Sequence, residues 1–157
     1  MDAPFRSSPI AVRPEWIDYN GHLNMAYYNV LFDTGVDQLW EVLGFGPDYR
    51  DTHNHTTFIA EFHVRYLREV HEGDQLTVTY QLLDHDEKRF HFYQEILHPD
   101  GWVSASGEGL GLHIDMSGPR VAPMPENILA NFRALKKAHE ALPIPATVGQ
   151  PIGIKRK

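Results

Sequence analysis

The hydrophobic pattern is most regular between residues 25 and 43. Apolar side chains recur there at spacings of three and four, at Met25, Tyr28, Phe32, Val36, Leu39 and Leu43. That spacing is typical of one buried face of an α-helix, and polar side chains follow at intervals of four on the other face. Asn24 comes directly before this segment, where its side chain can accept from the first free amides. The pattern therefore predicts a helix over Met25–Leu43.

Segments with strand character lie on both sides of this helix. The expected strands are Ile10–Asp18, Phe58–Val70, Gln75–Leu83, Arg89–Leu97 and Trp102–Ile114. A loop is expected over Gly44–Thr57, and a last helix over about Pro125–Leu142, with proline near its first position. The order strand, long helix, four-strand meander, helix predicts an α+β fold. In it, a curved antiparallel sheet of about five strands wraps the long helix.

Composition narrows the class of protein. The 157 residues carry 14 Lys and Arg against 21 Asp and Glu, which gives a formal net charge of −7. This length favours one domain over residues 1–157, with the last helix and a tail from about residue 123. An acidic chain is not expected to bind nucleic acid or an anionic membrane. The absence of cysteine excludes a thiolate zinc site and a Cys nucleophile. No apolar run is typical of a signal peptide or a membrane span. We therefore expect a cytoplasmic protein.

The densest group of reactive side chains is Asp18-Tyr19-Asn20-Gly21-His22-Leu23-Asn24, directly before the predicted helix. Here a carboxylate and an imidazole meet a helix N-terminus, whose free N–H groups stabilise developing negative charge. This combination indicates attack on a carbonyl group whose oxygen faces those amides. The alternative is a plain turn with a capping Asn, which composition alone favours.

The motif Asp18-x-x-Gly21-His22-x-Asn24 ahead of an apolar helix resembles that of hotdog-fold acyl-CoA thioesterases of the 4-hydroxybenzoyl-CoA thioesterase type. Within that family, further stretches are similar to the betainyl-CoA thioesterases of carnitine breakdown: Pro14-Glu15-Trp16-Ile17, Tyr66-Leu67-Arg68-Glu69-Val70, Asp86-Glu87-Lys88-Arg89-Phe90-His91 and Ala138-His139-Glu140-Ala141-Leu142-Pro143. The chain departs from the family pattern at two places. Trp16 stands where many relatives carry a second Asp, and Met25-Ala26-Tyr27 replaces the polar helix entry expected of a betainyl enzyme.

The resemblance implies a hotdog-fold enzyme that hydrolyses an acyl-CoA to free acid and coenzyme A, with betainyl-CoA or another short acyl-CoA as substrate. It implies that Asp18 attacks the thioester or activates water while the backbone amide of Met25 holds the carbonyl oxygen. His22 and Asn24 would shape the loop. It also implies a homodimer, or a higher assembly such as a tetramer of dimers. No metal and no cofactor are expected, because coenzyme A is part of the substrate.

Substrate contacts are expected from six side chains: Trp16, Tyr28, Asp33, Glu61, Lys88 and Arg89. The two aromatic rings would flank the acyl group, and the two acids would line its pocket. The basic pair would bind the phosphates of coenzyme A. Each group also has a structural interpretation, namely core packing for the aromatics, solvent-facing positions for the acids and a solubilising turn for the basic pair.

Two other activities stay open at this point. Asp18-x-Asn20-x-His22 is close to the Asp–His spacing of hotdog enoyl-CoA hydratases and dehydratases, and a non-catalytic acyl-CoA-binding module is the alternative outside enzymes. The alternating glycines of the last strand are expected to let another backbone approach it. His53-Asn54-His55 offers two imidazoles without a third ligand, which is too little for a metal site.

Overall fold

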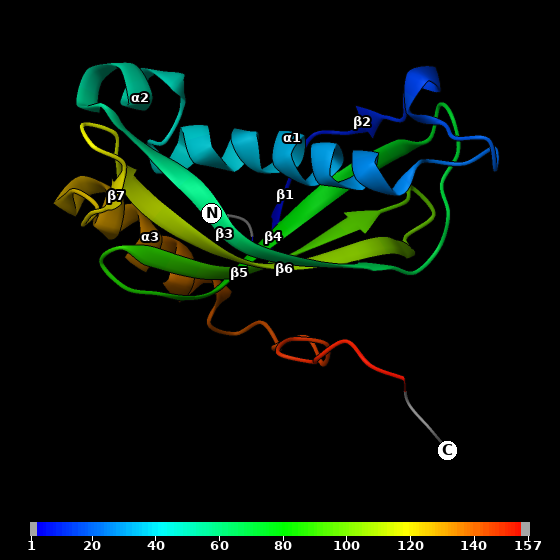
Figure 1. Cartoon of the computed structure of the whole chain (residues 1–157). Coiled ribbons are helices and arrows are strands. Elements are labelled where there is room, and N and C mark those ends of the chain that lie inside the picture. Colours follow the sequence, from blue (N-terminus) through cyan, green and yellow to red (C-terminus); the bar gives the residue numbers. More distant parts are fainter. Residues whose placement is uncertain (1–2, 155–157) are drawn as a thin grey trace.

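The computed structural model describes residues 3–154, and its centre is one antiparallel sheet curved around a long helix (Figure 1). The sheet order is β1-β4-β5-β6-β3, with β2 also pairing β4 and β7 pairing β6. The long strands are β3 (His55–Tyr66), β4 (Gln75–His85), β5 (Arg89–Leu97) and β6 (Val103–Asp115). The short strands are β1 (Phe5–Arg6), β2 (Ile10–Ala11) and β7 (Arg120–Val121). The predicted architecture of a wrapped central helix is confirmed.

Helix α1 (Met25–Leu43) has the predicted bounds because both of its ends are capped. The Asn24 side chain accepts from the Ala26 N–H at 2.9 Å, and Gly44 ends the helix in the left-handed conformation with φ 89°. Midway along α1, Gly35 lies against Val78 of β4, and a Cβ at Gly35 would overlap the valine side chain. The helix therefore packs on the sheet at a distance that only glycine permits.

The alternating glycines of β6 have a different role from the one expected. Among residues 3–154, the atoms nearest to a Cβ at these positions belong to side chains and not to a second backbone. Instead, phenylalanine rings from the neighbouring strands occupy the space that side chains at these positions would need. The pairs are Gly107 with Phe62, Gly109 with Phe92 and Gly111 with Phe90. These rings join the core between α1 and the sheet, so the glycines make room for aromatic packing.

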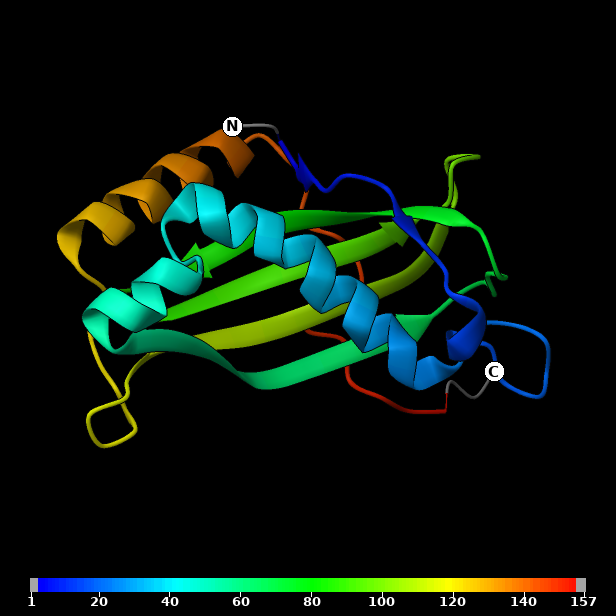
Figure 2. The same cartoon turned by 90° about the horizontal axis from the view of Figure 1, so that it is seen from above.

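Several segments differ from the expected secondary structure. Strands β1 and β7 are not among the expected strands, and the predicted strand Phe58–Val70 already ends at Tyr66. The predicted strand Ile10–Asp18 is wrong beyond β2, because Pro14 begins a 3-10 helix, η1 (Pro14–Trp16), which ends the strand pairing. The predicted loop Gly44–Thr57 contains the short helix α2 (Pro47–His53), with proline at its first position, and β3 begins earlier than expected. The last helix, α3 (Glu126–His139), lies beside α1 (Figure 2).

The two ends of the sheet carry different features. The N-terminus of α1 and the loop before it lie at one end, while α2, β7 and the turn between β4 and β5 lie at the other (Figures 1 and 2). After α3, the chain crosses the face of the sheet opposite α1 (Figure 1). Over residues 3–154, none of the helices combines the length and apolar character needed to span a membrane.

Candidate active site

The loop that precedes α1 is a short hairpin that fixes the backbone of Asp18. Ile17 and Leu23 form an antiparallel bridge, and the Asp18 N–H donates to the His22 carbonyl at 3.1 Å. At the turn, the Gly21 N–H donates to the Asp18 carbonyl at 2.9 Å. Gly21 has φ 82°, a conformation that glycine adopts without strain. The sequence Asp18–Leu23 thus folds locally and holds the carboxylate just ahead of the helix.

The Asp18 carboxylate is half-buried and keeps one oxygen available. Its Oδ1 accepts from the Asn20 N–H at 2.8 Å. Its Oδ2 accepts no hydrogen bond from the described part of the chain. His22 does not pair with this carboxylate, since its Nδ1 lies 3.4 Å from the Leu23 carbonyl oxygen. The carboxylate can therefore approach a ligand through Oδ2 without first breaking a contact with His22.

The first turn of α1 presents one unoccupied amide beside this loop. The Asn24 side chain accepts from the Ala26 N–H, and the Asn24 carbonyl accepts from the Tyr27 N–H at 3.0 Å. The Met25 N–H has no acceptor among residues 3–154, and Met25 is 64% exposed. A free N–H at a helix N-terminus carries the positive end of the helix dipole. Such an amide can stabilise the oxygen of a carbonyl group under attack.

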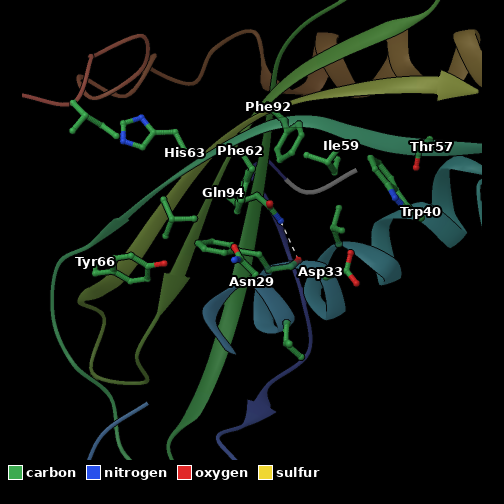
Figure 3. Close-up of a pocket in the computed structure, with 15 residues that line it drawn as sticks. Asn29, Asp33, Trp40, Thr57, Ile59, Phe62, His63, Tyr66, Phe92 and Gln94 are labelled. Carbon is green, nitrogen blue, oxygen red and sulfur yellow. Dashed lines mark hydrogen bonds between the residues drawn. The ribbon is translucent and has the colours of Figure 1, made fainter. Parts of the chain in front are cut away.

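A cavity of about 740 Å³ runs between α1 and β3 (Figure 3). Tyr66 forms part of its wall, and the Tyr66 hydroxyl donates to the Met25 carbonyl at 3.3 Å, so the cavity begins next to the first turn of α1. Asn29 and Asp33 project from the helix on one side and His63 from β3 on the other. Aromatic rings make up much of the remaining lining. This cavity has the position and the character of an acyl-binding pocket.

Two residues of this pocket were not singled out in the sequence. Gln94 is 2% exposed and lies in the pocket floor, with its Nε2 donating to the Phe32 carbonyl at 3.2 Å (Figure 3). The sequence feature that could have indicated Gln94 is its position, because this polar residue alternates with Phe92 and Ile96 on the buried face of β5. Tyr66 begins one of the stretches that resemble the family, but its contact with α1 depends on the tertiary fold.

The two aromatic residues expected at the reactive loop belong to the core. Trp16 is 7% exposed, with the Tyr27 ring stacked at 5.7 Å and the Arg13 guanidinium 5.1 Å from its centroid. Trp16 therefore packs in the core, and its expected role as a wall beside the acyl group stays a prediction. Tyr28 is buried behind Tyr66, with the rings edge to face at 5.1 Å. Burial raises the pKa of the Tyr28 hydroxyl above its ordinary value.

The two expected acids lie in separate cavities. Asp33 lines the acyl pocket from α1, eight residues after Met25. At about 1.5 Å per residue this places it about 12 Å along the helix from the free amide. Glu61 lines a second cavity of about 540 Å³ on the far side of β3. The structure thus brings Asp33 to the pocket wall but not Glu61.

Lys88 ends the turn between β4 and β5, and Arg89 begins β5, at the opposite end of the sheet from Asp18 (Figure 1). Arg89 pairs with Asp86 at 2.6 Å, while Lys88 Nζ lies 3.4 Å from the exposed carboxylate of Glu87. Partial burial raises the pKa of Asp86, but hydrogen bonds from the Arg89 side chain and from the two backbone amides together lower it. Within one chain, the basic pair and the reactive loop are therefore not brought together.

The loop histidines do not gather into a metal site. His53 stacks on Tyr49 at 4.8 Å, and His55 meets His113 edge to face at 5.1 Å. Across residues 3–154, no group of three or more potential His, Asp and Glu ligands is suitably placed to hold an ion. These rings pack where α2, β3 and β6 meet.

Comparison with known proteins agrees with this geometry. The model of the thioesterase-like superfamily matches residues 12–132. A betainyl-CoA thioesterase from Pseudomonas aeruginosa is 42% identical over 144 residues, which cover 91% of each chain. An L-carnitine dehydrogenase/betainyl-CoA thioesterase from Rhizobium meliloti is 34% identical over 98% of this chain, and the match spans only 31% of that longer protein.

Solved structures show the same fold. A hypothetical protein from Staphylococcus aureus in complex with CoA has a TM-score of 0.89 at 27% identity, with 99% of each chain covered. A DHNA-CoA thioesterase from the same organism has a TM-score of 0.75 at 15% identity, covering 84% of this chain and 93% of that one. The chain belongs to the thioesterase-like superfamily. The sequence-based predictions of a hotdog fold and of a thioesterase are confirmed.

Proposed function

We propose that this thioesterase hydrolyses betainyl-CoA to betaine and coenzyme A at the junction of the Asp18 loop and α1. The observation that carries the proposal is a carboxylate with a free oxygen beside a helix-terminal amide with a free N–H, in a chain 42% identical to a betainyl-CoA thioesterase. Another short acyl-CoA is the alternative substrate. A coenzyme A ester is a cytoplasmic metabolite, which supports a cytoplasmic location.

The chemistry requires one attack and one bond cleavage. An oxygen nucleophile attacks the thioester carbon, and the electron pair of the C=O bond moves to the oxygen, where the Met25 N–H stabilises it. The C–S bond then breaks and the thiolate of coenzyme A leaves. If water attacks, Asp18 takes its proton as a general base. If Asp18 attacks, it forms a mixed anhydride that water hydrolyses in a second step. Neither route needs a cofactor.

The acyl group of betainyl-CoA fixes where its charge would lie. Only one methylene separates the quaternary nitrogen from the carbonyl carbon, so the ammonium group stays at the first turn of α1. There the partly exposed ring of Tyr66 offers an aromatic face, and the Asp18 carboxylate offers opposite charge. A desolvated cation–π contact contributes about 2 kcal/mol.

The separation between the basic turn and the reactive loop supports a homodimer. The strands β4 and β5 separate the basic turn from the reactive loop by about 30 Å, at roughly 3.3 Å per residue. Within the described part of the chain, strand β3 is an unpaired sheet edge that exposes Phe58 and Ile59, with Leu67 exposed just beyond its end. Pairing two β3 edges antiparallel brings the basic turn of a second copy to the α1 N-terminus of the first. Strands are spaced about 5 Å apart, so β5 of the second copy, which carries the basic turn, is about 15 Å from β3 of the first copy.

Two measurements test these proposals. The first is thiol release from betainyl-CoA and from its neutral isostere, 3,3-dimethylbutanoyl-CoA. We expect kcat/KM to favour the cation by about thirtyfold, the ratio that 2 kcal/mol implies. Equal hydrolysis of both esters would leave a general short-acyl thioesterase. An absorbance change on an enoyl-CoA without thiol release would indicate a hydratase instead.

The second measurement is the mass in solution by sedimentation equilibrium. We expect a dimer, or a tetramer built from dimers, and a shift toward the monomer in Ile59→Lys, which places a charge on the proposed edge. A wild-type monomer would contradict the dimer.

A further inference from the structure

The chain after α3 is fastened across the outer face of the sheet. We call residues 143–152 the C-terminal strap. Starting from β4, its contacts follow the strand order: Gln81 Nε2 donates to the Pro143 carbonyl at 3.2 Å, and the hydroxyls of Tyr93 and Thr147 lie 3.1 Å apart. Further on, Arg65 of β3 donates to the Gln150 carbonyl at 2.9 Å.

Glu108 of β6 makes the most specific of these contacts. Both of its carboxylate oxygens accept from the Gly149 N–H, at 3.1 and 2.9 Å. His91 of β5 lies 2.8 Å from the same carboxylate through its Nε2. Gly149 has φ 71°, which favours glycine at this point of the strap. The strap therefore has a defined path, and Glu108 determines where its last residues lie.

The strap ends at Ile152, which lies beside residues of β3, the last strand in the sheet order. Ile152 lines the acyl pocket and also the second cavity, which lies between the strap and the outer face of the sheet. Phe62 and His63 of β3 are shared by both cavities in the same way. Ile152 is 87% exposed, so its side chain is available to a ligand. These three residues separate about 740 Å³ from about 540 Å³.

We propose that the C-terminal strap sets the length of acyl chain that the enzyme accepts, with Ile152 as the specificity-determining side chain and Glu108 as its positioning residue. This inference rests on the proposed acyl-CoA substrate and adds to it. The distance along β3 from Tyr66 to His63 gives the length of acyl chain that fits. His63 precedes Tyr66 by three residues on β3, which is about 10 Å at roughly 3.3 Å per residue.

An acyl chain of single bonds of roughly 1.5 Å spans this distance with about eight carbons. The methyl groups of betainyl-CoA end well before Ile152, at the Tyr66 end of the pocket. Chains up to about eight carbons fit against Ile152, and longer chains meet it. Replacement by alanine joins the two cavities, so that a longer chain can continue into the second one.

The experiment compares Ile152→Ala with Ile154→Ala. Ile154 is 88% exposed on the same segment but lines neither cavity, which makes it a matched control. In Ile152→Ala, we expect the ratio of kcat/KM for decanoyl-CoA over butyryl-CoA to rise by about tenfold, a discrimination typical of small changes in an apolar pocket. Hydrolysis of betainyl-CoA, whose methyl groups end before Ile152, should change less than hydrolysis of decanoyl-CoA. An unchanged ratio, or an equal rise in Ile154→Ala, would overturn the inference.

Glu108→Ala tests the positioning role, because alanine leaves no side-chain acceptor for the Gly149 N–H. It should raise the same ratio, and the double variant with Ile152→Ala should add little, because the two side chains act through one contact. A purely structural role would lower the melting temperature and reduce the hydrolysis of all esters equally. In an Asp18→Asn background, calorimetric binding of decanoyl-CoA and butyryl-CoA gives the corresponding ratio of dissociation constants. A wild type that releases no thiol would contradict the proposed function, while the binding ratio would still test the strap.

Discussion

Asp33→Asn tests where the ammonium group of betainyl-CoA binds. The substitution distinguishes binding at the start of α1 from binding midway along this helix. Asp33 is exposed and lies about 12 Å along the helix from the Met25 amide, at about 1.5 Å per residue. The betainyl nitrogen lies next to the carbonyl carbon, so it stays near Met25. Two unit charges 12 Å apart in water interact by about 0.3 kcal/mol, and salt screens this further. Removing the Asp33 charge should therefore change kcat/KM for betainyl-CoA by less than about twofold.

The assay is thiol release under initial-rate conditions at physiological ionic strength. Asp37→Asn is the matched control, because Asp37 is one helical turn further on and does not line the pocket. A direct ion pair with the ammonium group would instead cost about thirtyfold, from about 2 kcal/mol. A loss of this size in Asp33→Asn alone would refute the assignment of the carbonyl oxygen to the Met25 amide.

Three further predictions follow from individual contacts. Lys88→Ala should raise KM about threefold with kcat unchanged, and the rise in KM should be smaller in high salt. Arg89→Ala should mainly lower the melting temperature, because Arg89 is paired with Asp86. Tyr80→Phe should raise the free energy of unfolding in urea by about 1 kcal/mol, since the buried Tyr80 hydroxyl has no partner within residues 3–154; a loss of stability would contradict this. Burial lowers the pKa of His113 below its ordinary value of 6.5. The contribution of this neutral side chain to stability is therefore present above pH 6.5 and is lost as the pH falls through the lowered pKa. The melting temperature should drop over that pH range, and it should drop less in His113→Gln.

The sequence was sufficient for elements whose ends are determined locally. Helix α1 has the predicted bounds because Asn24 and Gly44 cap it, and β5 has the predicted bounds because turn residues flank it. The first strand failed at Pro14, where a 3-10 turn replaced the expected extension. The short helix α2 was missed because seven residues give no clear hydrophobic period.

In the candidate active site, too, local features could be predicted and contacts between distant segments could not. The spacing from Asp18 to Met25 is local, so the sequence could indicate a carboxylate beside a helix N-terminus. Contacts between distant segments could not be predicted in the same way. Tyr66 reaches Met25 across 41 residues, and Arg65 reaches Gln150 across 85. Such contacts depend on which strand lies beside α1 and where the C-terminal strap crosses, and hydrophobic periodicity carries neither.

Turnover of betainyl-CoA by Asp18→Asn is the most direct test of the central claim. This substitution keeps the shape of the side chain and the acceptor for the Asn20 N–H, while it removes the basicity and nucleophilicity of the carboxylate. If Asp18 activates water or attacks the thioester, kcat should fall at least about a hundredfold with the fold intact by circular dichroism. A variant that keeps more than about a tenth of the wild-type kcat on the best ester would contradict catalysis by Asp18.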